Sequence, residues 1–323
     1  MYSLFTAHIP FLAVLIAGFF LWCYIVASSV EFGLSLLILF PRLAGERSLL
    51  VITILNPIWE VNNVFLVGFF VSLFAFFPGF VPWLTITLFT PLCIFVAVSG
   101  ARILLVLVFF YSSWEWLKKS LVVRSAFALC SFAGPVLLAV GAVAVLTGIA
   151  PSLWPASFFW LVAAAVCVAL SSLAAFAGLF GRKTFGDVAV IAYAASAIWF
   201  FKMLPFYMPW VSITHPQFLS SAFTWTSLLL VAALALVFAG RLVRRPAIAF
   251  TGLAAVAGIL IIFVAALQQP YLAYPFVSAA SAFTALATAK ILFGAFAGGS
   301  VILIPSILLL YWLFVFNKKP VVL

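Results

Sequence analysis

The chain has little charge: only 6% of its 323 residues are Asp, Glu, Lys or Arg, and just five of them are acidic. Soluble domains are typically about 25% charged and about 45–50% apolar. Here 68% of the residues are hydrophobic and the mean hydropathy is +1.41. A soluble fold of this size buries only about three quarters of its surface. The shortage of charge therefore excludes a soluble enzyme, a coiled coil and a disordered chain, and it predicts a polytopic membrane protein.

Cysteine and histidine are also scarce, and neither is placed to bind a metal or a haem. The four cysteines lie scattered in apolar runs with no CxxC spacing, so neither a disulfide framework nor a thiolate metal site is predicted. His8 and His215 lie outside the predicted membrane spans. Because haem in a membrane bundle usually needs His or Met ligands on the helices, we expect this chain alone to bind none. No P-loop, HExxH or Ser-His-Asp pattern is present, so no catalytic residue and no metal site are predicted in this chain.

Long apolar runs take up most of the sequence. A hydrocarbon core about 30 Å thick requires about 20 helical residues for each crossing. This length predicts an all-α fold of about nine transmembrane helices, at 9–39, 50–77, 81–112, 122–148, 155–180, 187–203, 219–239, 246–267 and 290–316. No soluble domain fits between them, so residues 1–323 are predicted to form a single integral membrane domain.

The basic residues gather on one side of these spans. Twelve fall in alternate connections or at the C-terminal end, and the opposite side receives only Lys202 and Lys290. Cytoplasmic loops carry the excess of Lys and Arg. The pattern therefore predicts an N-terminus outside the cell and a C-terminus in the cytoplasm. The net charge of +10 is interpreted as this topology signal and not as a nucleic-acid surface.

Three charged residues lie inside apolar runs. Glu31 and Glu60 are predicted to lie about 12 and about 15 Å from the cytoplasmic face, and Arg102 at a similar depth. A charge at the centre of a membrane helix costs about 2.5–3.5 kcal/mol and marks either a structural pair or an ion path. One arginine neutralises one carboxylate, so the second is free to carry a proton. We therefore favour a proton path with Arg102 as the counter-charge, and a purely structural ion pair stays open.

Several polar and helix-breaking residues accompany Glu60. Asn62 and Asn63 follow it directly, and amides in hydrocarbon must find partners, so both are assigned to the proton path. Pro57 removes one helical hydrogen bond a turn earlier and frees a carbonyl. Pro57 and Trp59 are assigned to helix kinking and packing.

The sequence around these residues resembles subunit II of cytochrome bd-type quinol oxidases. The resemblance rests on residues 30–34 (VEFGL), 56–66 (NPIWEVNNVFL) and 74–78 (FAFFP), and on the position of Arg102 in the third helix. Residues 269–275 (QPYLAYP), Ile304-Pro305 and Tyr311-Trp312 are similar to the end of that family. Glu at both carboxylate positions resembles the shorter Gram-positive type.

The resemblance implies a bacterial cytoplasmic membrane protein of the respiratory chain that pairs with a haem-bearing subunit I. Haem b and haem d would lie in that partner, which oxidises quinol and reduces O2 to water. The expected fold is two four-helix bundles plus one peripheral helix. Residues 1–150 would form the first bundle with the polar cluster, 151–270 the second, and 271–323 an outer interfacial segment and the last helix.

Other partners and one other function stay open at this point. Membrane lipid, quinone and a small single-helix subunit are further candidate partners, and ubiquinol and menaquinol are not distinguished. The alternative function is a proton-coupled secondary transporter, because buried carboxylates with an arginine also occur there. However, Pro57 is not matched by an equivalent break in the second half of the sequence.

Overall fold

The computed structural model describes residues 2–40, 42, 48–111, 116, 120–179, 182–207, 216–243, 245–268, 270–273 and 275–311. Long α-helices dominate this part of the chain, because a helix satisfies its backbone hydrogen bonds within one segment and can therefore cross hydrocarbon. In chain order they are α1 (Tyr2–Leu39), α3 (Ser48–Phe76), α4 (Val81–Tyr111), α6 (Leu121–Thr147), α7 (Phe159–Ala177), α8 (Lys183–Tyr207), α10 (Pro216–Leu242), α11 (Pro246–Gln268) and α13 (Leu286–Tyr311).

Each predicted span overlaps one of these helices, and residues 112, 180 and 312–316 of the predicted spans lie outside the described residues. Within the described residues, seven helices are long and apolar enough to cross a membrane. Shorter apolar stretches, Val61–Phe76 and Leu286–Val301, lie in α3 and α13. The prediction of an all-α polytopic membrane protein is therefore confirmed, whereas the division into two bundles and the orientation in the membrane stay predictions.

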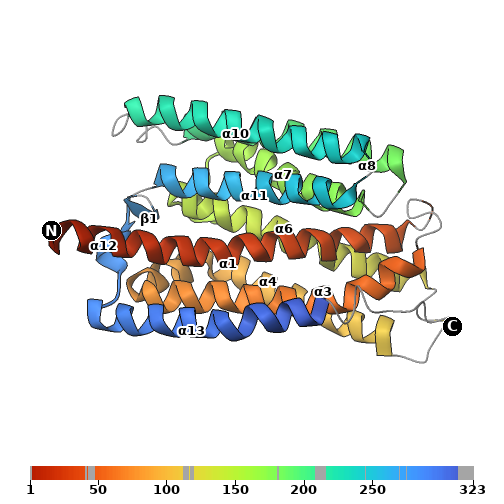
Figure 1. The fold of residues 1–323 in the computed structure, drawn as a ribbon, viewed down its shortest axis with the longest axis horizontal. Coiled ribbons are helices and arrows are strands. Elements are labelled where there is room, and N and C mark those ends of the chain that lie inside the picture. Colours follow the sequence, from red (N-terminus) through yellow and green to blue (C-terminus); the bar gives the residue numbers. More distant parts are fainter. Residues whose placement is uncertain are drawn as a thin grey trace.

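Helix α1 runs through the middle of the molecule (Figure 1). It packs most extensively against α3 and also contacts α7, α6 and α11. Its close approach to α7 depends on Gly33, where a Cβ atom would lie 2.3 Å from the carbonyl oxygen of Leu173. The hydroxyls of Ser29 and Ser172 lie 3.2 Å apart across the same two helices. Small residues thus bring α1 and α7 together, as is usual where lipid supplies no hydrophobic driving force for helix association.

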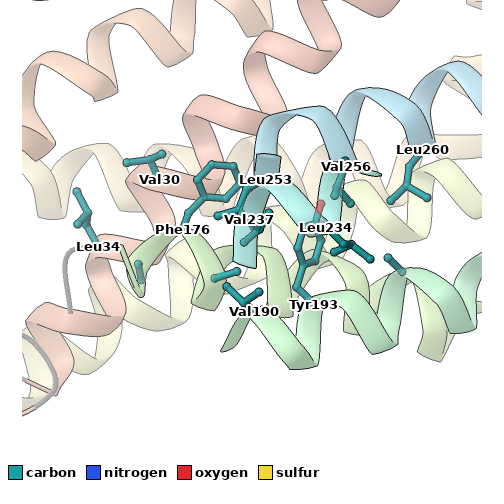
Figure 2. Packing of buried hydrophobic residues seen from close by; sticks show 14 of the residues in the cluster. Val30, Leu34, Phe176, Val190, Tyr193, Leu234, Val237, Leu253, Val256 and Leu260 are labelled. Atoms are coloured by element: carbon teal, nitrogen blue, oxygen red, sulfur yellow. The ribbon is translucent and has the colours of Figure 1, made fainter. Parts of the chain in front are cut away.

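The largest buried cluster joins α1 to α7, α8, α10 and α11. Figure 2 shows Val30 and Phe176 at one end of it, with Tyr193 and Leu234 further along. Gly252 permits α11 to approach α10, since a Cβ atom there would lie 2.6 Å from a methyl group of Val237. Helices from both halves of the sequence therefore share one core with α1.

A small cap closes the end of the bundle where α1 begins. Strands β1 (Tyr271–Ala273) and β2 (Val277–Ser278) pair antiparallel, and α12 (Ala279–Ala282) follows. The backbone N–H of Thr284 donates to the carbonyl of Phe76 at 2.9 Å, so the segment after α12 is bonded to the end of α3. The turn η2 (Pro78–Phe80) lies beside it, because a Cβ on Gly79 would approach the Cα of Ala282 to 2.8 Å.

Candidate functional site

The candidate site is a buried ion pair between α1 and α4. Nη1 of Arg102 lies 2.6 Å from Oε1 of Glu31. Glu31 is fully buried and Arg102 is 5% exposed. Oε1 of Glu31 accepts no hydrogen bond from the described residues, so its attraction to Arg102 is mainly coulombic. The two charges balance at a depth where a single charge would be costly.

Helix α3 supplies the second partner of the carboxylate. The amide Nδ2 of Asn62 donates to Oε2 of Glu31 at 2.5 Å. Asn62 is 3% exposed, so this amide is withdrawn from solvent together with the ion pair. Each oxygen of Glu31 thus faces a donor from a different helix, and the carboxylate connects α1, α3 and α4.

Helix α6 and two phenyl rings hold the guanidinium of Arg102. Nε of Arg102 donates to Oγ of Ser131 at 3.0 Å, and that hydroxyl donates to the carbonyl of Phe127 at 2.8 Å. The rings of Phe32 and Phe127 lie 4.4 and 5.4 Å from the guanidinium carbon. Rings at this range attract a cation, more strongly when it is desolvated. Arg102 is therefore held in place by α6 as well as by its counter-charge.

Besides Oε1 of Glu31, two buried polar atoms at the site have no hydrogen-bond partner among the described residues. They are Oδ1 of Asn62 and Nη2 of Arg102. One is an acceptor and the other a donor. Buried groups of this kind are usually satisfied by an ordered water molecule or change partners during function. The site thus keeps unused hydrogen-bonding capacity next to a carboxylate, which proton transfer requires.

The other residues assigned from the sequence are placed differently. Nδ2 of Asn63 donates to the carbonyl of Trp59 at 3.1 Å, within α3 itself. Trp59 is half-buried and packs against the large core cluster. Glu60 and Pro57 lie within the bounds of α3, but their side chains are outside the described residues. The structure thus brings Glu31, Asn62 and Arg102 together and leaves Asn63 on its own helix.

Sequence reasoning missed Ser131, Phe32 and Phe127. Serine or threonine in a membrane helix commonly donates to a carbonyl three or four residues earlier, as Ser72 and Thr147 also do here. The sequence around Ser131 therefore gives no sign that its hydroxyl also contacts Arg102. Phe32 follows Glu31 directly, but phenylalanine is too frequent in this chain to stand out. Among the described residues, no group of three His, Cys, Asp or Glu side chains could hold a metal ion.

The comparisons with known proteins agree with this architecture. The family model described as cytochrome bd terminal oxidase subunit II matches residues 9–314. One chain of the structure of bd oxidase from Geobacillus thermodenitrificans has a TM-score of 0.78 to this chain at 21% identity. That match covers 96% of this chain and 99% of the other, and at this identity it shows the shared fold. No curated protein sequence matches significantly. Because the family model spans nearly all of the sequence, the chain belongs to the cytochrome bd terminal oxidase subunit II family and is a multi-pass membrane subunit of an O2-reducing quinol oxidase.

Proposed function

We propose that this chain is the subunit of the oxidase without haem, and that it conducts protons from the cytoplasm towards a haem-bearing subunit I. Haem b, haem d and the quinol site are assigned to that partner, which reduces O2 to water. The observation that supports a proton path is the fully buried Glu31, which contacts Asn62 on one oxygen and Arg102 on the other. Reduction of O2 consumes protons, and protons need polar groups to cross apolar helices.

The pairing divides the roles of the two carboxylates. Arg102 balances the charge of Glu31. We assign the uptake and release of protons to Glu60, the second carboxylate of the predicted path. Residues three apart on a helix are neighbours, and residues two apart face different sides. A path from Glu31 to Glu60 would therefore follow the surface of α3 through Asn62 and Asn63. Both amides are in the described part of α3.

The position of Glu60 in α3 also indicates where the path leaves this chain. By helical spacing, residue 60 shares a face of α3 with Val64, Val67 and Val71, which are 42, 59 and 52% exposed. A carboxylate position on a face covered only by lipid would be expensive. We infer that subunit I covers this face and receives the proton there.

The test of the proton path is Glu60→Gln in the assembled oxidase. Glutamine keeps the size and hydrogen bonding of the side chain but cannot carry the proton. Quinol oxidase turnover should fall by roughly 10²–10⁴-fold if proton transfer becomes limiting, with near-normal haem content. Glu46→Gln, which changes a carboxylate predicted in a loop, is the matched control and should leave turnover unchanged. Full activity of Glu60→Gln with normal haem content would show that the buried charges are structural only.

A second pair of variants tests the partner face. Val67→Arg should prevent this chain from co-purifying with subunit I, because it places an unpaired cation in the interface. Val231→Arg on α10 is the control, since Val231 is similarly exposed at 65% and lies outside the proposed interface. Both variants carry the same cost of an arginine in the membrane, about 2.5–3.5 kcal/mol near its centre. Equal loss of the partner in both would contradict the assignment of this face.

A further inference from the structure

A second polar cluster lies where α7, α8 and α10 meet, at the end of the bundle away from the β1–β2 hairpin (Figure 1). Nε of Arg241 on α10 is 2.5 Å from Oδ1 of Asp187 on α8, and its Nη2 donates to the carbonyl of Lys183 at 2.8 Å. Gly186 leaves room for this arginine, because a Cβ atom there would lie 2.5 Å from Nη1. Arg241 therefore ties α10 to the start of α8 and neutralises Asp187.

Three more cations surround this ion pair and remain exposed. Arg182 and Lys183 stand at the start of α8, and Arg245 lies in the turn between α10 and α11. Within the ranges that the structure describes, no ion pair is formed by any of the three. Since Asp187 already has its partner, this corner of the molecule carries a local excess of positive charge.

An apolar surface leads away from these cations along α8. Val188 and Ile191 are 67 and 57% exposed and lie one and two turns into the helix. Their face leads to a groove of about 630 Å³ between α7 and α8, lined by Cys167, Leu170, Ser171, Ala192, Ala195, Ser196 and Trp199. The start of the groove at Ala192 is nine residues beyond Lys183, or about 13 Å along the helix axis.

The groove itself offers no polar group that needs a partner. The hydroxyls of Ser171 and Ser196 lie 2.6 Å apart and share a hydrogen bond, and a carbonyl oxygen of its own helix lies within hydrogen-bond distance of each hydroxyl. The small side chains of Ala192 and Ala195 leave space in the groove, and Trp199 lines its far end. The surface is therefore complementary to a hydrocarbon chain that descends from a negatively charged group.

We propose that an anionic phospholipid binds at this site. Its phosphate lies between Arg182, Lys183 and Arg245, and one acyl chain follows Val188 and Ile191 into the groove between α7 and α8. A topology signal alone explains basic residues at a membrane border, but it does not require an apolar groove that leads from them. A cation near an anionic membrane surface contributes about 1 kcal/mol, or roughly fivefold in affinity, so three cations together contribute on the order of 100-fold.

The experiment uses the assembled oxidase in neutral detergent, titrated with phosphatidylglycerol or with phosphatidylcholine, with bound lipids counted by native mass spectrometry. The combined variant Arg182→Gln, Lys183→Gln and Arg245→Gln should bind one phosphatidylglycerol on the order of 100-fold more weakly. The matched control removes three exposed cations elsewhere, with Arg42→Gln, Lys202→Gln and Lys290→Gln. It should retain that lipid, and phosphatidylcholine binding should be the same in both variants.

A further variant tests the groove without changing any charge. Ala195→Phe places a ring in the groove from an exposed position and should weaken phosphatidylglycerol binding roughly tenfold or more, because the acyl chain loses its contact surface. Where the combined variant does not assemble, Arg182→Gln and Arg245→Gln are measured singly, and each should weaken binding. Unchanged binding in these variants, or equal loss in the control, would overturn the proposal.

Discussion

Arg102 on α4 and Glu31 on α1 form an ion pair, with Nη1 2.6 Å from Oε1, although α4 packs mainly against α6 and α1 mainly against α3. The pair therefore links helices whose principal packing partners differ. Ser131 on α6 completes the link, because it accepts a hydrogen bond from Arg102 and donates one to its own helix. The stability of the polar site thus depends on four helices at once.

Arg102→Leu should destabilise the assembled oxidase by about 3–5 kcal/mol, since it leaves a buried carboxylate without its cation. The midpoint of thermal unfolding and the yield of complex are the measurements. Arg102→Leu combined with Glu31→Leu removes both charges and should recover much of the loss, because an apolar pair can replace a buried ion pair. A single variant as stable as the unmodified complex would contradict this.

Ser131→Ala should weaken the site by a smaller amount, about 1–3 kcal/mol, because Nε of the buried Arg102 loses its acceptor. Ser131→Thr keeps the hydroxyl and should lose less. The same unfolding measurement separates the two variants. If both lose equally, the packing of Ser131 matters and its hydrogen bond does not.

Gly33→Ala should disturb the contact between α1 and α7, where the added Cβ would lie 2.3 Å from a backbone oxygen. Overpacking of this kind costs about 1–3 kcal/mol. Gly18→Ala on the same helix is the control, since nothing lies within 4 Å of a Cβ at that position. Thermal unfolding should distinguish the variants, and equal stability would argue against a close contact at Gly33.

Reporter fusions test the predicted orientation. A reporter fused after Leu323 should be active in the cytoplasm, and one inserted within residues 203–218 should not, because twelve basic residues lie on the predicted cytoplasmic side and two on the other. Paired reporters that are active on opposite sides give the measurement. Reversed signals would invert the topology and the direction of the proposed proton path.

Expression of this chain without its partner tests where the haems bind. A reduced-minus-oxidised spectrum should lack stoichiometric haem bands, whereas the assembled oxidase should show them. The physical reason is that neither histidine of the sequence falls in a predicted span. A full haem complement on the isolated chain would refute the assignment of haem to subunit I.

The sequence predicted the helices better than the contacts of the polar residues. Helix positions follow from the length of apolar runs, since each crossing must be apolar and about 20 residues long. The similar depth of Glu31 and Arg102 was also predictable from counting along the helices. The rotation of the helices decides which carboxylate faces Arg102. The packing of α6 against α4 decides whether Ser131 reaches that arginine. Neither can be deduced from local periodicity. The transporter alternative fails because the chain belongs to the oxidase family.

The second half of the chain shows the same limit. Helices α10 and α11 approach closely at Gly240 and Gly252, where an added Cβ atom would clash with the other helix, and the sequence alone does not show which helices meet there. Asp187 lies beside a basic loop, where the sequence alone indicates a solvated surface charge, yet it pairs with Arg241, which follows it by 54 residues. Charge counting can assign a residue to one side of the membrane, but it does not select its partner.

The partners of Glu31 are also ordered in time, because they lie on helices that are synthesised after α1. Asn62 follows Glu31 by 31 residues and Arg102 by 71. At synthesis rates of about 5–20 residues per second, the cation emerges roughly 4–14 s after the carboxylate. During that interval Glu31 has only the amide of Asn62 to bond with among its described partners. Until α4 has been synthesised, α1 therefore carries an acidic residue whose counter-charge is not yet present.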